Sequence, residues 1–195
     1  LRGDAMKDEA YFMAKNEGNK FASELVGQIS DLNKGIYLHD IIETTYNSDF
    51  CIGVAGYPEK HMESPSMQAD LRRLKEKVDS GAAYVVTQMF FDNKKYFAFV
   101  KAARAMGIQV PIIPGIKPIA VQRHLSILPQ VFSLDLPDAL VSDVEKCKNS
   151  GEVRQVGIEW AIQQSKELVE AGVPVLHYYS MGKSDNIKAI ASQVF

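Results

Sequence analysis

Largely apolar runs alternate with amphipathic helical patterns along most of this chain, and this alternation restricts its fold more than any other feature. The apolar runs cover residues 51–55, 83–88, 110–115 and 175–179. Strands that are apolar throughout, instead of alternating with polar residues, are buried on both faces, as in a parallel sheet covered by helices. The sequence therefore predicts an α/β fold in which each strand is followed by a helix.

Apolar spacing and capping residues mark the helices between these runs. Residues 67–80 carry an apolar stripe at helical spacing, and Gly81 follows where a C-terminal cap belongs. Asp92 is a suitable N-cap for a helix that reaches Met106, and Gly107 would end it. The other expected helices cover residues 21–33, 120–128, 137–148, 152–171 and 185–194. Residues 36–49 fit no clear pattern.

The number of strand–helix units predicts part of a (β/α)8 TIM barrel. Four complete units, with a strand end at residues 1–4, make just over half of a barrel that needs roughly 250 residues. In this interpretation residues 1–195 form one partial domain, from about the end of the fourth strand to the last helix, and the N-terminal part of the barrel is absent. The chain alone is then expected to be unstable or to associate through exposed strand edges. An open doubly wound sheet is the alternative, although neither a Gly-x-Gly-x-x-Gly nor a Walker sequence occurs.

Charge and composition exclude several classes of protein. The formal net charge of -2 gives no electrostatic reason to expect nucleic acid or an anionic membrane as partner. No apolar run approaches the roughly 20 residues that cross a bilayer, and no signal peptide is visible. Cys51 and Cys147 are far apart, which favours reduced cysteines over a disulfide framework or a metal site. These features predict a cytoplasmic protein without a metal site.

Polar side chains follow each expected strand, and the carboxyl ends of parallel strands share one edge. Tyr57, Glu59 and His61 follow the first complete strand, and Gln88 ends the next. Together the strand ends offer aromatic surfaces, amide and phenol hydrogen-bonding groups, several cations and a carboxylate. That set suits a large, flat, partly anionic ligand better than a bare metal ion.

Each candidate also has a structural interpretation that the sequence leaves open. Asp4 could be a helix cap, His61 could pack in a loop, and Asp70 could pair with a cation on its own helix. Lys77 lies among charged neighbours, which favours a solvated helix face. Gln88 could make a structural hydrogen bond, and His177 fits a core histidine better than a catalyst. Glu59 and Glu63 have no partner that the sequence identifies.

Seven short motifs, in a fixed order and spread over nearly the whole chain outside residues 5–50, carry a family resemblance. They are Leu1-Arg2-Gly3-Asp4, Gly56-Tyr57-Pro58-Glu59-Lys60-His61, Gln68-Ala69-Asp70-Leu71, Lys77-Val78-Asp79-Ser80-Gly81-Ala82, Thr87-Gln88-Met89-Phe90-Phe91-Asp92, Ile113-Pro114-Gly115-Ile116 and His177-Tyr178-Tyr179. In this set the chain resembles the 5,10-methylenetetrahydrofolate reductase family.

The resemblance implies a flavoprotein oxidoreductase of one-carbon metabolism and methionine biosynthesis. In that family FAD accepts a hydride from NADH or NADPH and passes it to 5,10-methylenetetrahydrofolate, giving 5-methyltetrahydrofolate in ping-pong fashion. The full-length protein is expected to be a homo-oligomer, and this piece alone to be inactive. The competing hypothesis, from another class, is a non-catalytic module that binds flavin or folate or scaffolds a partner subunit.

The resemblance also implies roles for individual residues. Asp4 would act electrostatically beside both the flavin ring and the folate. The residues expected to bind the cofactor are Arg2, Gly3, Asp4, Tyr57, His61, Asp70 and Lys77. Those expected to bind the folate are Asp4, Gln88, His124 and Lys183. His124 stands where relatives often have Gln, and Lys183 where many have Arg, which forms a planar fork to a carboxylate that Lys cannot.

The general acid of the family is not expected within this chain. It is a Glu near the end of the first barrel strand, a part of the barrel that the resemblance places before Leu1. Neither Glu59 nor Glu63 is assigned its role.

Overall fold

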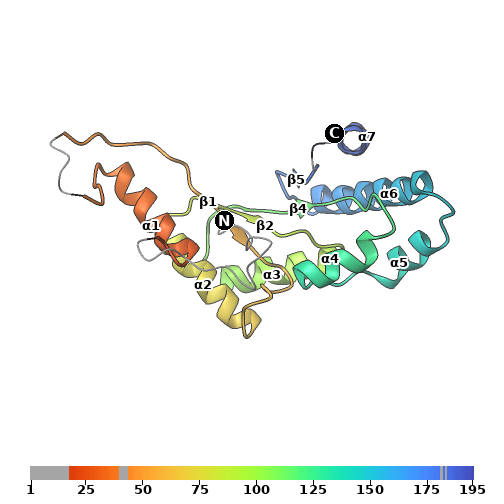
Figure 1. Ribbon diagram of the computed structural model, residues 1–195, viewed down its shortest axis with the longest axis horizontal. Coiled ribbons are helices and arrows are strands. Elements are labelled where there is room, and N and C mark those ends of the chain that lie inside the picture. The colour runs from red at the N-terminus through yellow and green to blue at the C-terminus, as the bar shows by residue number, and fades with distance from the viewer. Residues whose placement is uncertain (1–17, 40–43, 181, 183) are drawn as a thin grey trace.

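The computed structural model describes residues 18–39, 44–180, 182 and 184–195. Arg2, Gly3, Asp4 and Lys183 therefore lie outside the described residues. Figure 1 shows the strands in the middle of the molecule, with α2, α3 and α4 along one side and α6 toward the C-terminal end.

The described strands are all parallel, and they pair in the order in which they occur along the chain. Strands β1 (Gly53–Gly56), β2 (Tyr84–Thr87) and β3 (Ile112–Ile113) form one ladder, and β4 (Gly115–Ile116) pairs with β5 (His177–Tyr178). A parallel sheet with helical connections confirms the predicted α/β class.

The expected strand at 110–115 is divided into β3 and β4 at Pro114, which has no N–H to give to a ladder. At the break, side chains join the two ladders. The side-chain hydroxyl of Thr87 accepts a hydrogen bond from the Gly115 N–H at 2.9 Å. The backbone carbonyl of Thr87 accepts one from the Tyr179 hydroxyl, also at 2.9 Å. Thr87 is fully buried, and through these two bonds the end of β2 is joined to the β4–β5 side of the break.

The helices largely follow the predicted ranges. They are α1 (Ala22–Asn33), α2 (Met67–Asp79), α3 (Asn93–Ala105), α4 (His124–Phe132), α5 (Asp138–Glu145), α6 (Ser150–Glu170) and α7 (Asp185–Val194). Asp92 caps α3 as expected, since its side chain accepts from the Lys94 N–H. Gly81 and Gly107 have positive φ angles just after α2 and α3, a conformation that glycine adopts without strain. Helix α4 begins four residues later than predicted.

Two hydrophobic clusters hold these elements together. The larger one joins the sheet to α2, α3, α6 and α7, and it includes Leu71 and Leu74 from the predicted stripe of α2. The second lies where α4, α5 and α6 meet the turn after β4, and it contains Ile119 and Val153. Gly157 lets α6 approach this turn, because a Cβ there would overlap the Ile119 backbone.

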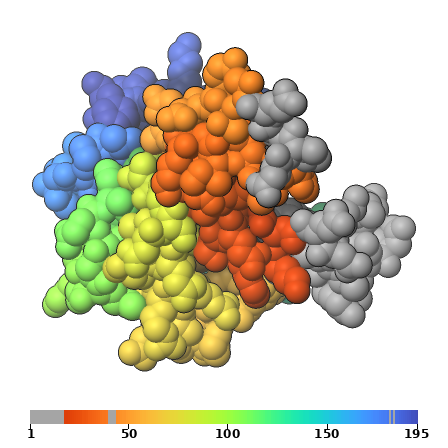
Figure 2. All heavy atoms as spheres, turned by 90° about the vertical axis from the view of Figure 1, so that its left-hand side faces the viewer, coloured from red at the N-terminus to blue at the C-terminus, as the bar shows by residue number. Residues whose placement is uncertain are grey.

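Helix α1 covers the end of the molecule next to α2, which it contacts. Figure 2 faces this end and shows α1 in red-orange beside the yellow of the α2 region. Large apolar side chains are exposed on this part of the chain, at Phe21, Ile36, Leu38, Tyr46 and Phe50.

Candidate functional site

The loop after β1 is held in shape by its own lysine. Lys60 has a positive φ angle of 77°, and its ammonium donates to the carbonyls of His61 and Ser64 at 2.9 and 2.7 Å. The Ser64 N–H also donates to the His61 carbonyl at 2.9 Å. The side chain of Lys60 is thus occupied within the loop, and it fixes where Tyr57 and His61 lie.

Three of the predicted cofactor residues meet at the start of α2. The ring of Tyr57 makes an edge contact with the ring of His61, with centroids 4.7 Å apart. The backbone N–H of His61 donates to the Asp70 carboxylate at 3.2 Å, and Asp70 is itself buried in the first turn of α2. His61 Nδ1 accepts from the Glu63 N–H at 3.1 Å, so a neutral imidazole carries its proton on Nε2. The cluster presents an aromatic face and an N–H donor.

Lys77 does not lie on a solvated face, so that alternative is wrong. Its ammonium turns toward the sheet and donates to the Ala55 carbonyl of β1 at 2.5 Å. Burial lowers the pKa of Lys77, and the Asp70 carboxylate acts in the opposite direction. The structure therefore brings Lys77 together with Asp70 and His61 at the end of β1.

Gln88 follows the neighbouring strand. Its backbone N–H donates to the Gly56 carbonyl at 2.8 Å, directly before Tyr57. Its half-buried side-chain amide makes no hydrogen bond to another described residue. The alternative role of Gln88, a structural hydrogen bond, is thus not seen in the described part of the chain. The amide can both donate to and accept from a ligand.

His124 begins α4, beyond the end of β4. Its Nδ1 accepts from the Ala120 N–H at 3.2 Å, which leaves Nε2 to carry the proton of a neutral ring. Burial and, second, the charge of Lys117 lower the pKa of His124. His124 therefore offers one N–H donor, where an amide would offer both a donor and an acceptor.

The lowered pKa of His124 gives a pH prediction. Below pH 6.5, the ordinary pKa of histidine, the unfolded chain binds a proton at His124 more readily than the folded chain does. Stability should therefore fall as pH falls from 6.5 toward the lowered pKa. His124→Gln should reduce this loss, measured as the free energy of unfolding in urea at pH 7.5 and pH 5. His39→Gln, at an exposed position, is the matched control. An unchanged pH dependence in H124Q would contradict the assignment.

Glu59 serves the architecture of the site. Its nearly buried carboxylate binds Lys95 of α3 and accepts from the Asp135 N–H at 2.9 Å, and Lys95 also binds the Asp135 carboxylate at 2.6 Å. Burial lowers the pKa of Lys95, but the hydrogen bonds to Asp135 and Glu59 outweigh it and raise the pKa above its ordinary value. This bridge ties the loop after β1 to α3 and to the segment before α5. Sequence reasoning missed it because Lys95 lies 36 residues from Glu59.

Lys95→Met should lower the free energy of unfolding by about 2 kcal/mol, because it leaves a mostly buried carboxylate without its cation. Lys94→Met, at the exposed neighbouring position, should change it little. Chemical denaturation of both variants measures the difference. Adding Glu59→Gln to Lys95→Met should recover part of the lost free energy of unfolding. Equal losses in K94M and K95M would show that the bridge does not stabilise the fold.

The residues of β5 have separate structural roles. The Tyr178 hydroxyl donates to Ser165 of α6 at 2.8 Å, so this side chain packs against the helix. His177 is exposed and lies edge-on to the ring of Tyr179 at 4.7 Å. The prediction of a core histidine was wrong because β5 pairs with β4 alone among the described strands, which leaves His177 on an open edge.

Among the described residues no cluster of His, Cys, Asp and Glu could hold a metal ion. No described helix is both long and apolar enough to cross a membrane. Cys51 and Cys147 are both free thiols, as expected.

Comparison with known proteins agrees with the resemblance in the sequence. The family model described as methylenetetrahydrofolate reductase matches residues 1–194. The chain is 34% identical over its whole length to methylenetetrahydrofolate reductase 1 of Schizosaccharomyces pombe, covering 30% of that protein. It is 34% identical to 5,10-methylenetetrahydrofolate reductase of Salmonella typhimurium, over 96% of this chain and 66% of that one. A protein of Caenorhabditis elegans named probable methylenetetrahydrofolate reductase (NADPH) is 37% identical over 76% of this chain and 23% of that one. The chain thus spans between about a quarter and two thirds of the length of these relatives.

Proposed function

Because this chain belongs to the methylenetetrahydrofolate reductase family, we propose that it is part of an enzyme that reduces 5,10-methylenetetrahydrofolate to 5-methyltetrahydrofolate. FAD would be the cofactor and NADH or NADPH the donor, in a cytoplasmic homo-oligomer. The observation that carries the proposal is the meeting of Tyr57, His61, Asp70 and Lys77 at the end of β1, one strand from the amide of Gln88, which makes no hydrogen bond to another described residue.

We further propose that residues 1–195 form one partial domain, the later part of a (β/α)8 barrel. Parallel strands that pair in chain order support this, because a barrel adds each strand beside the previous one. A doubly wound sheet reverses its strand order at the point where ligands bind, and no reversal occurs among the described strands.

The donor set at the end of β1 fits FAD. The phenol ring of Tyr57 suits a flat partner with polar edges, and the ammonium of Lys77 suits ribityl or phosphate oxygens. His61 adds an N–H donor, while Asp70 holds the His61 backbone in place. When bound, FAD would supply the hydride-transfer chemistry. Arg2 and Gly3 would contact the same cofactor.

Three further side chains would hold the folate. The Gln88 amide can donate and accept along a pterin edge, and the His124 Nε2–H can donate beside it. Lys183 would attract the glutamate carboxylate. Asp4 would lie near the flavin ring and the folate and would favour the cationic form of the substrate. Glu59 is bound to Lys95, so we assign it no proton transfer.

The test is flavin binding followed by turnover. The full-length protein should purify with flavin absorbance and oxidise NADH or NADPH with menadione as acceptor. Flavin or folate binding without that oxidation would favour the non-catalytic module instead. Purification without flavin, together with failure to reconstitute it, would sink the proposal.

A further inference from the structure

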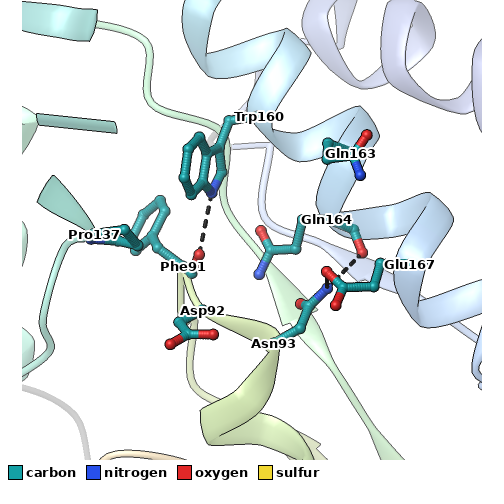
Figure 3. A pocket seen from close by; sticks show the side chains of 8 residues that line it. All are labelled: Phe91, Asp92, Asn93, Pro137, Trp160, Gln163, Gln164 and Glu167. Atoms are coloured by element: carbon teal, nitrogen blue, oxygen red, sulfur yellow. Dashed lines mark hydrogen bonds between the residues drawn. The ribbon is translucent and has the colours of Figure 1, made fainter. Parts of the chain in front are cut away.

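A pocket lies between the start of α3, the start of α5 and the middle of α6. It has a volume of about 250 Å³. Figure 3 shows the side chains that surround it, which are Phe91, Asp92, Asn93, Pro137, Trp160, Gln163, Gln164 and Glu167. None of them is among the residues assigned above to the cofactor or the substrate.

The buried side chain of Asn93 has an amide oxygen that lacks a hydrogen-bond donor among the described residues. Asn93 is 4% exposed, and its Nδ2 donates to the Gln164 carbonyl at 3.0 Å and to the Glu167 carboxylate at 2.8 Å. Both partners accept hydrogen bonds only, so the amide cannot be turned over. Its Oδ1 is buried and has no partner among the described residues. Buried amide oxygens are normally paired, and this one calls for a donor from outside the described chain.

Two donors around the pocket are engaged with backbone carbonyls. Trp160 Nε1 donates to the Phe91 carbonyl at 3.1 Å, which fixes the indole ring, and Gln164 Nε2 donates to the Phe90 carbonyl at 2.9 Å. Figure 3 shows the indole and the Asn93 amide on opposite sides of Gln164. In the described structure the Gln164 amide makes no hydrogen bond to Asn93 Oδ1.

The charge and surface of the pocket favour a cation. Asp92 and Glu167 contribute carboxylates, and no lysine, arginine or histidine is among the lining residues. Trp160 and Phe91 supply aromatic surface, and the indole is the side chain that attracts cations most strongly. An anionic ligand would meet two carboxylates and no cationic side chain among the lining residues.

We propose that this pocket binds a small organic cation, a guanidinium or ammonium group on a short apolar stem. Its N–H groups donate to Asn93 Oδ1 and to the Glu167 carboxylate, and its stem lies along Trp160 and Phe91. The volume lies just below the roughly 300 Å³ at which pockets for drug-sized ligands begin, so the ligand is a small one. This proposal does not depend on flavin or folate binding.

Trp160 makes the proposal testable, because it is the one tryptophan of the 195-residue chain and it lines the pocket. The full chain is titrated with butylguanidinium while tryptophan fluorescence is recorded. A saturable change is expected. Butylurea has nearly the same shape without the charge, and it should give no saturable change at tenfold higher concentration, roughly the factor expected for a charge-assisted contact.

Two variants on α6 locate the binding. Glu167→Gln should weaken butylguanidinium roughly tenfold while still accepting from Asn93. Glu170→Gln removes the same charge one turn away, outside the lining residues, and should leave the affinity unchanged. Circular dichroism confirms that both variants are folded. If butylurea binds as well as the cation, if the two variants behave alike, or if no saturable change occurs, the proposal is overturned.

Discussion

Replacing Gly157 with alanine is expected to lower the free energy of unfolding by about 3 kcal/mol, the upper part of the range for forcing extra atoms into a packed interior. The new Cβ would overlap the carbonyl group of Ile119, a backbone atom that cannot rotate out of the way. Either α6 or the turn after β4 must move. Both carry residues of the second cluster, where Ile119 and Val153 are almost fully buried, so the movement would also loosen that cluster.

The matched control is the same substitution in another helix. At Gly27 of α1, the Cβ of an alanine would meet no atom of another described element within 4 Å. Gly27→Ala should therefore stabilise the chain by up to about 1 kcal/mol through helix propensity alone. Urea unfolding of the two variants gives both numbers. If G157A unfolds at the same urea concentration as the parent, α6 does not pack on the turn as closely as described.

Replacing Lys77 with methionine is expected to weaken FAD binding roughly 30- to 100-fold, the cost of losing a charge-assisted contact in a half-buried position. Methionine keeps the length of the side chain and removes its charge. Stability should change by less than about 1 kcal/mol, because the loss of the hydrogen bond to Ala55 is offset by removal of an ammonium whose burial lowers its pKa.

Lys75→Met is the control for this experiment. Lys75 lies on the same helix and pairs with Asp79 across one turn at the surface. Its loss should leave FAD affinity unchanged, as measured by flavin fluorescence. Equal affinities in K77M and K75M would remove Lys77 from the proposed cofactor site, without bearing on the pocket at Trp160.

Local signals were sufficient to predict most of the helices, although α4 begins four residues later than expected. The stripe of α2, the Asp92 cap and the glycines after α2 and α3 all act within a few residues, so the sequence displays them directly. Helix α7 has the predicted bounds. The parallel sheet also followed from continuous apolar runs, although Pro114 divides one of them.

The remaining features depend on contacts between distant residues or on the direction of one long side chain. Lys95 and Glu59 are 36 residues apart, and Asn93 and Glu167 are 74 apart, so no spacing rule joins them. Lys77 stands among charged neighbours, yet its flexible stem carries the ammonium toward β1. His177 is exposed because β5 lies at an edge among the described strands, and the sequence alone does not show which strand is an edge strand.

The break at Pro114 has a consequence for how the molecule opens. Because the β2–β3 ladder ends there, the hydroxyl and carbonyl of Thr87 join the ladder β1–β2–β3 to the pair β4–β5, and we expect the two to open separately. Amide hydrogens of β2 should then exchange with solvent far more slowly than those of β5, and the boundary between slow and fast exchange should fall at a single threonine.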